Sequence, residues 1–143
     1  MTSEVHRVLA SDPAAWGREH LQTDIVGWLT TRSPDGPLQT AVISFLWDGG
    51  TIVFYSRPGM PKIRNIERSP EVSFHLNSDP FGDHVLIIEG TAAIEPTFPP
   101  SDVHPAYRAK YRAPLEHWGM DESATARDFF VPIRITPTRI RAW

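Results

Sequence analysis

The chain has 143 residues, 14 basic against 17 acidic side chains and no cysteine, which gives a net charge of −3 with neutral histidines. This length fits one domain that can bury a core without cross-links. The missing cysteines exclude a disulfide framework, a zinc site with thiolate ligands and a cysteine nucleophile. The acidic balance argues against bulk binding to nucleic acid or anionic lipid.

The N-terminal segment carries no long apolar run and no basic leader, and nothing later approaches the ~18 uninterrupted apolar residues of a membrane helix. We therefore expect a cytoplasmic protein that does not enter a membrane. Residues 1–143 are expected to form a single domain that starts with a helical segment over 1–22. Within this segment, Asp12 is predicted to cap a helix whose first residue is Pro13.

Three strands are predicted in the first half of the chain, over 25–31, 38–47 and 51–56. Turn sequences rich in Gly, Pro and Asp, at 33–36 and 48–50, separate them. The 38–47 strand is apolar at both odd and even positions. This pattern is typical of a strand that is covered on both faces.

A short helix is predicted over 60–68, because a proline suits its first turn and a Ser-Pro pair ends it. An alternating strand follows over 71–78, and a longer strand over 84–94 contains Gly90, which predicts a bulge or bend.

Residues 96–128 form a proline-rich helical insertion before the last strand, with helical patterns over 105–111 and 123–130. The last strand is predicted to begin at Val131. Together the elements predict a mainly β protein, an antiparallel barrel or sandwich of five or six strands with short helices. Because strands that are apolar on both sides cannot all be satisfied inside one small barrel, a cofactor or a second subunit should cover the outer face. We expect a homodimer with twofold symmetry.

The segment from Arg57 to Arg68 runs from a strand end through a glycine loop into a helix, with four basic residues and one acidic residue, a local charge of +3. A helix N-terminus offers free N–H groups and a positive dipole end. With the Ser56 hydroxyl and the Arg57 and Lys62 cations, these features fit a phosphate site. A solvated basic helix explains the charges equally well from spacing alone.

Several short motifs follow one another along the chain: Tyr55-Ser56-Arg57-Pro58, Lys62-x-x-Asn65-Ile66, Ser69-Pro70-x-Val72-Ser73, Tyr107-x-x-Lys110-Tyr111 and a final stretch from Val131 to Ile140. In this order they resemble the pyridoxamine 5′-phosphate oxidase-like split-barrel superfamily, which binds flavins and deazaflavins. The later motifs look like its branch of F420-dependent reductases. The resemblance covers about residues 23–143. It implies a six-stranded antiparallel Greek-key split β-barrel (the FMN-binding split barrel), a homodimer, and two cofactor sites at the subunit interface.

The resemblance also implies which residues bind the cofactor phosphate. The lysine that matches Lys62 grips this phosphate in the superfamily, and the strand end that matches Ser56 and Arg57 does likewise. Asn65 belongs to the same motif as Lys62 and is included in the expected cofactor site.

Other positions are implied to lie along the cofactor ring. The stretch Thr40, Ala41 and Val42 matches one that follows the ring system, largely through backbone groups. His84 matches a position that can reach the neighbouring subunit's cofactor. An exposed terminal tryptophan is unfavourable unless it packs, so Trp143 is expected to stack on a flat ring or to cap the partner subunit's core.

The chain departs from the pyridoxamine phosphate oxidases, which carry Arg and Lys on the second strand where this chain has Thr40 and Phe45. Their substrate-binding basic residues near the C-terminus are also missing. These departures count against vitamin-B6 oxidation and favour coenzyme F420, a deazaflavin, over FMN. The expected function is an oxidoreductase that transfers a hydride from reduced deazaflavin to a small electron-poor organic acceptor. The alternatives are an FMN-binding oxidoreductase and a non-catalytic flavin- or deazaflavin-binding protein.

Other chemistries find little support in the sequence. The six histidines show no metal-ligand spacing, so no metal site is expected, and no catalytic residue is assigned. No P-loop, dinucleotide fingerprint or nucleophile elbow occurs. A nucleic-acid-binding barrel is disfavoured by the net charge. Tyr107, Tyr111, Trp118 and Met120 in the insertion are either core residues or a wall over the ring of the cofactor.

Overall fold

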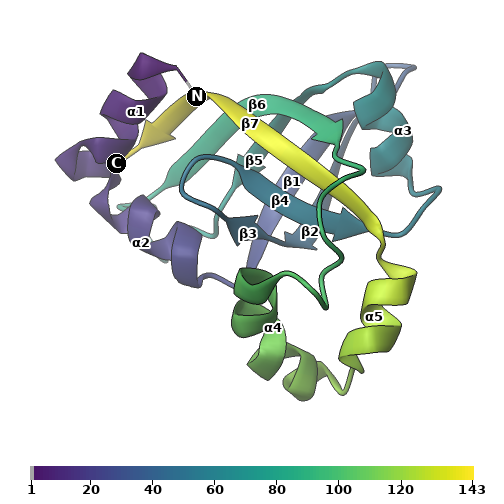
Figure 1. Ribbon diagram of the computed structural model, residues 1–143. Helices are drawn as coiled ribbons and strands as arrows, with labels where there is room; N and C mark the ends of the chain where they lie inside the picture. The colour runs from purple at the N-terminus through teal and green to yellow at the C-terminus, as the bar shows by residue number, and fades with distance from the viewer. Residues whose placement is uncertain (1) are drawn as a thin grey trace.

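The computed structural model describes residues 2–143, which form helices around one curled antiparallel sheet (Figure 1). The strands are β1 (Val26–Arg32), β2 (Leu38–Ser44), β3 (Leu46–Trp47), β4 (Ile52–Ser56), β5 (Glu71–His75), β6 (Leu86–Ile94) and β7 (Val131–Ala142). The helices are α1 (Ser3–Ala10), α2 (Ala15–Thr23), α3 (Pro61–Arg68), α4 (Pro105–Trp118) and α5 (Glu122–Asp128), with a 3-10 turn η1 (Asp12–Ala14) before α2.

The sheet has the strand order β2-β1-β5-β6-β7-β4-β3, and each pair of neighbours is antiparallel. Its two edge strands, β2 and β3, are consecutive in the chain and are separated only by Phe45. The two edges of the sheet must therefore lie side by side, which curls the sheet into a barrel, and β2 also contacts β4. The prediction of a mainly β antiparallel split barrel is confirmed.

The sheet has seven strands where six were expected, because the predicted 38–47 strand breaks at Phe45. Up to Ser44 the chain pairs with β1, and from Leu46 it pairs with β4. At the break, the Phe45 N–H donates to the Tyr111 hydroxyl at 2.7 Å, and the Phe45 carbonyl accepts from Lys110 Nζ at 2.6 Å. Side chains of α4 thus replace the ladder hydrogen bonds that Phe45 does not make.

The core fills the inside of the barrel with side chains from the strands of the sheet and from α1–α3. Phe45 packs edge-on against Phe74, with ring centroids 5.0 Å apart. Gly27 on β1 is required here, since an added Cβ would lie 2.3 Å from the Phe74 ring. The largest fully buried side chains are Tyr111, Phe45, Phe54, Phe74, Leu21, Leu29, Ile52, Leu86, Ile88, Ile133, Ile135 and Val5.

The N-terminal helices differ from the prediction. A separate helix α1 is present, capped by the Thr2 hydroxyl, which accepts from the Val5 N–H at 3.2 Å, and it packs against β7. The prediction that Asp12 caps a helix is wrong: Ser11 precedes η1, and Asp12 lies inside this turn.

Several other helices and strands are present as predicted but begin or end at different residues. Strand β5 ends at His75, and β6 starts at Leu86, so both are shorter than predicted. The predicted irregularity at Gly90 is confirmed as a register shift between Glu89 and Gly90. Helix α4 continues well past residue 111 to Trp118, and Gly119, which follows it, adopts a left-handed conformation with a φ of 66°. Within residues 2–143, no helix is long and apolar enough to cross a membrane.

Candidate functional site

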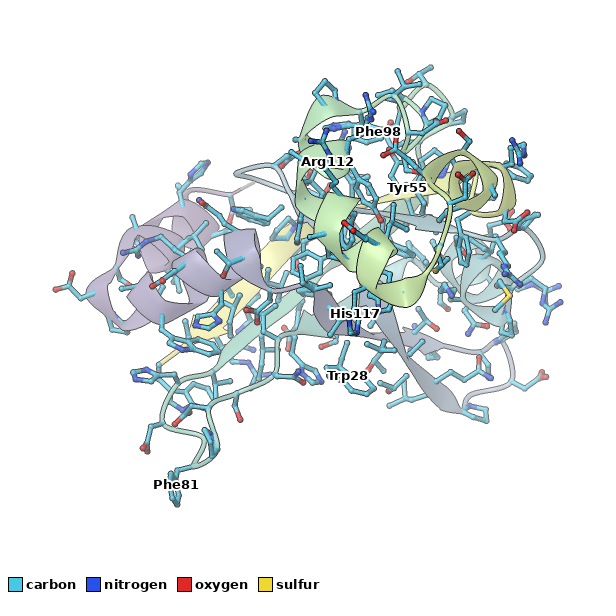
Figure 2. The ribbon with its side chains drawn as sticks, turned by 90° about the horizontal axis from the view of Figure 1, so that it is seen from below. Trp28, Tyr55, Phe81, Phe98, Arg112 and His117 are labelled. Carbon is cyan, nitrogen blue, oxygen red and sulfur yellow. The ribbon has the colours of Figure 1, made fainter. Side chains whose placement is uncertain are left out.

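A cavity of about 270 Å³ lies between one end of the barrel and the helices α4 and α5. Its walls come from β2, β4, the first turn of α3 and the insertion that carries α4 and α5. The residues that line it are Val42, Ile43, Ser44, Tyr55, Lys62, Ser101, Tyr107, Arg108, Tyr111, Leu115, Trp118, Met120, Glu122, Thr125 and Phe129. Figure 2 shows Tyr55 and Phe98 beside these helices, on the side of the molecule that holds the cavity.

The barrel side of the cavity is the edge strand β2. Its neighbour in the sheet is β1 alone, so one row of β2 peptide groups remains available to a ligand. Val42 is 51 % exposed and lines the cavity, whereas Ile43 faces the barrel core. Leu38, at the start of β2, is 71 % exposed. The expectation that both faces of this strand are covered is therefore not met within one chain.

The cationic corner of the cavity is formed by the start of α3. Met60 precedes the helix and Pro61 occupies its first turn, where a missing N–H costs nothing. Lys62 then projects into the lining of the cavity. Burial alone lowers the pKa of the Lys62 ammonium, and no hydrogen bond or ion pair to residues 2–143 offsets this effect. A desolvated cation without a partner favours the binding of an anion.

Arg57 lies at the same corner. Its guanidinium stands over the ring of Phe129, 4.7 Å from the centroid, and Phe129 in turn lines the cavity. This stacking holds the arginine at the rim while leaving its N–H groups free for an anion. The structure thus places Val42 and Lys62 in the cavity lining, and Arg57 on Phe129, which belongs to the same lining.

Two other expected residues have protein partners in this region. The Ser56 hydroxyl is buried and donates to the Arg57 carbonyl at 2.9 Å. The buried Asn65 amide donates to Thr31 Oγ1 at 2.9 Å and to Gln39 Oε1 at 2.6 Å. Asn65 therefore joins α3 to β1 and to β2. Cofactor binding by Ser56 and Asn65 remains a prediction.

Thr40 and Ala41 lie on β2, on the side of Val42 away from the Phe45 break. The Thr40 hydroxyl lies 2.9 Å from the hydroxyl of Thr30 on β1, and neither Thr40 nor Ala41 lines the cavity. Their backbone groups belong to the same edge strand as Val42.

His84 and Trp143 lie at the other end of the barrel. Strand β7 pairs with Ser56 at its start and with Leu86 at its end. Because it has 12 residues and a strand rises ~3.3 Å per residue, its two ends lie roughly 35 Å apart. The Trp143 indole donates to the Gly82 carbonyl at 3.1 Å, and the His84 ring stacks at 5.8 Å on Trp16. Figure 2 shows Phe81 of this loop projecting far from α4 and α5. Within one chain, these residues do not reach the cavity.

The opposite wall is aromatic. The Tyr107 ring stacks on Tyr111 at 4.6 Å and meets the Tyr55 ring edge-on at 4.9 Å. Tyr111 is 2 % exposed, while Trp118 and Met120 are exposed at the rim. Tyr111 is a core residue, as one interpretation from sequence expected, and all four residues line the cavity. The expectation that they form a wall over the ring of a cofactor stays a prediction.

These phenols stay protonated at neutral pH. Burial raises the pKa of Tyr55 to about 12, and its hydroxyl donates to the Pro99 carbonyl at 2.6 Å. Burial also raises the pKa of Tyr111 to about 12, although the Phe45 N–H and the Ser44 side chain counteract part of the rise. The pKa of Tyr107 is raised by burial and by the two neighbouring tyrosines.

Lys110, next to Tyr111, lies behind this wall and was not predicted to belong to the site. Its ammonium donates to the Phe45 carbonyl and stands 3.8 Å from the centroid of the Phe45 ring. Burial lowers its pKa to about 8, and the charge of Asp24 counteracts part of this shift. An ion pair between Arg108 and Glu122, 2.8 Å long, joins α4 to α5 at the cavity.

Sequence reasoning also missed Ser44, Tyr55 and Phe129 as cavity residues. Tyr55 stands inside one of the motifs that carry the resemblance, but no role was expected for it. Phe129 follows α5 and has no spacing signal toward Arg57. Over the described part of the chain, no cluster of three or more His, Cys, Asp or Glu side chains could hold a metal ion.

Solved structures share this fold. An F420 reductase is 26 % identical, with a TM-score of 0.65, and the match covers 87 % of this chain and 94 % of that one. A candidate pyridoxamine 5′-phosphate oxidase from Listeria innocua is also 26 % identical, with a TM-score of 0.63 and coverage of 89 % and 94 %. The haem storage protein HutZ from Vibrio cholerae, 16 % identical with a TM-score of 0.62 and coverage of 88 % and 91 %, is similar in fold alone.

The sequence itself matches no curated protein significantly. It does match the family model described as pyridoxamine 5′-phosphate oxidase over residues 17–143, which is most of the chain and includes every strand of the barrel. The chain therefore belongs to the pyridoxamine 5′-phosphate oxidase family.

Proposed function

We propose that the cavity binds coenzyme F420 and that the protein is an oxidoreductase, in which reduced deazaflavin supplies a hydride to a small electron-poor organic acceptor. The observation that carries this proposal is the position of Lys62, an unpaired and partly desolvated cation, beside an aromatic cavity at a free sheet edge. An anionic group next to a flat ring system matches both features. Family membership and the 26 % identity to an F420 reductase support it.

The residues at the start of α3 fit the phosphate of such a cofactor. Lys62 supplies a cation from the first turn of the helix, where backbone N–H groups and the helix dipole also favour an anion. Arg57, fixed on Phe129, supplies a second cation at the rim. The positively charged segment continues along the exposed face of α3, which an anionic tail can follow.

The ring has a matching place between β2 and α4. On one side, the free peptide groups of β2 near Val42 offer hydrogen bonds to the polar edge of the ring. On the other side, the aromatic wall offers flat apolar surface. The chain thus anchors, orients and partly dehydrates the cofactor, and the redox chemistry is that of the cofactor.

A homodimer belongs to the same proposal. Leu38 and Val42 on β2 are exposed apolar side chains on the outer face of the sheet, and a second copy of the chain would cover them. His84 and Trp143, which lie far from the cavity of their own chain, would then approach the cavity of the partner. Sedimentation of the purified protein at several concentrations tests this part, and a monomer throughout would contradict it.

Cofactor binding is tested by titrating the purified protein with coenzyme F420 and, separately, with FMN, and by following the quenching of ligand fluorescence. Lys62→Ala should weaken F420 binding at least about ten-fold, since a charged hydrogen bond contributes ~1.5–3 kcal/mol. Arg7→Ala is the control, because it removes one positive charge at an exposed position of α1, outside the basic segment of α3 and outside the cavity lining. Preference for FMN, or binding of neither ligand, would reject the proposal.

Turnover is tested separately. Oxidation of reduced F420 should accelerate when the protein and a panel of conjugated ketones and quinones are mixed. Binding of F420 without turnover of any acceptor would identify a carrier on the same barrel instead of an enzyme.

A further inference from the structure

The three tyrosines of the cavity differ in what their hydroxyls do. The Tyr55 hydroxyl donates to the Pro99 carbonyl, and the Tyr111 hydroxyl donates to the Ile25 carbonyl at 2.6 Å and accepts from the Phe45 N–H. The Tyr107 hydroxyl has no hydrogen-bond partner among residues 2–143, and the causes of its raised pKa are burial and neighbouring phenols only. It is the polar group of the aromatic wall that the fold leaves unused.

The Tyr107 hydroxyl is accessible to solvent. Within residues 2–143, no side-chain oxygen or nitrogen is both sealed from solvent and unpartnered, so the unpartnered Tyr107 oxygen must reach open space. Tyr107 lines the cavity, and its ring is held from two directions by the stack on Tyr111 and the edge contact with Tyr55. A rigid donor of this kind is already oriented before a ligand binds.

The chemistry of this donor defines what it can bind. A phenol that stays protonated offers one O–H to an acceptor oxygen and cannot neutralise an anion. Among the charged groups of the cavity, Arg108 pairs with Glu122, and Lys62 lies at the start of α3, while Ser101 and Thr125 add neutral hydroxyls to the lining. The Tyr107 ring contacts Tyr55 and Tyr111, and the cavity lining also includes the apolar side chains of Leu115, Trp118 and Met120. This combination fits a flat, neutral, conjugated molecule that carries a carbonyl oxygen.

We propose that the Tyr107 hydroxyl donates a hydrogen bond to the carbonyl oxygen of a planar conjugated ketone or quinone, and thereby determines which acceptor is reduced. The inference rests on the proposed function. When an enone gains a hydride at its β-carbon, the C=C electron pair shifts and negative charge develops on the carbonyl oxygen. Tyr107 stabilises this charge without giving up its proton, and water supplies the proton that completes the reduced product. The acceptor gains two electrons, which reduced F420 loses with the hydride.

The test is a binding measurement on the cofactor-free protein with benzylideneacetone and with the alkene that has a methylene group in place of its carbonyl. Wild-type protein should bind the ketone more tightly than the alkene, and the infrared C=O stretch of the bound ketone should shift to lower frequency. Tyr107→Phe keeps the ring and its stacking. It should weaken ketone binding about five-fold, the value of one net hydrogen bond, abolish the infrared shift and leave alkene binding unchanged.

Two outcomes overturn the inference. One is equal ketone affinity and an unchanged C=O stretch in Tyr107→Phe, or no preference for the ketone in the wild type. The other is a loss of F420 or FMN affinity in Tyr107→Phe with ketone binding intact, which would assign the hydroxyl to the cofactor.

The two proposals fail separately. If the ketone results hold while neither cofactor binds, the proposed function is wrong and the carbonyl site remains. If F420 binds and Tyr107→Phe has no effect on the ketone, the proposed function stands without the role of Tyr107. Tyr55→Phe is the control variant, since its hydroxyl is committed to the Pro99 carbonyl and its loss should not alter the infrared shift.

Discussion

Replacing Tyr111 by phenylalanine removes a single oxygen that holds three backbone segments together. This hydroxyl accepts from the Phe45 N–H at 2.7 Å, donates to the Ile25 carbonyl at 2.6 Å and lies 3.0 Å from the Phe45 carbonyl. Ile25 leads into β1, and Phe45 joins β2 to β3. Without the hydroxyl, the edges of the barrel lose these hydrogen bonds to α4.

The expected cost follows from which groups lose their partner. The Phe45 carbonyl keeps Lys110, but the buried Phe45 N–H has no replacement, and the Ile25 carbonyl loses its bond. A buried unpaired group costs ~1–3 kcal/mol, so Tyr111→Phe should lower the free energy of unfolding by about 2 to 4 kcal/mol. For a domain of this size, that change lowers the Tm by roughly 5 to 15 °C.

Urea unfolding at equilibrium, followed by tryptophan fluorescence, measures the difference, and a constant m-value shows that the loss is one of stability. The matched control is Tyr107→Phe, which makes the same chemical change in the adjoining ring but breaks no protein hydrogen bond and should cost less than ~1 kcal/mol. Equal stability of Tyr111→Phe and wild type, or an equal loss in both variants, would refute the role given to this hydroxyl.

Two further predictions concern the barrel core and the pH dependence of stability. Gly27→Ala places a methyl group 2.3 Å from the buried Phe74 ring and should cost ~1–3 kcal/mol, whereas Gly50→Ala, with nothing within 4 Å, should be neutral in the same urea assay. The lowered pKa of Lys110, about 8, means that the folded protein holds fewer protons than the unfolded chain above that pH. The free energy of unfolding should therefore rise from pH 8 to pH 10 relative to Lys110→Met, and a flat difference would contradict a desolvated lysine.

Features that depend on a few adjacent residues were predictable from the sequence. The turn at 48–50 joins β3 to β4 because Asp48 accepts from the N–H groups of Gly50 and Thr51. The helix over 61–68 starts at its proline, and the irregularity falls at Gly90. In each case the conformation is fixed by the chemistry of the residues themselves.

Features that depend on distant partners were not predictable. Tyr111, 66 positions further along the chain, stabilises the break at Phe45. The apolar pattern of 38–47 does not indicate this break. The predicted helix covers only 105–111, yet α4 continues through Pro114 to Trp118. The cavity was only partly predicted for the same reason. Lys62 belongs to a local motif, while the packing of the insertion places Phe129 in the lining and Lys110 behind the aromatic wall.

Neighbouring turns of helix α4 have two different roles. Tyr111 and Lys110 secure the junction between the barrel edges, and Tyr107 and Trp118 face the cavity. Exchanging the whole insertion to change ligand preference would therefore also remove the Tyr111 and Lys110 hydrogen bonds and destabilise the barrel. Substitutions confined to positions 107, 115, 118 and 120 keep these hydrogen bonds and are the practical route to altered ligand selectivity.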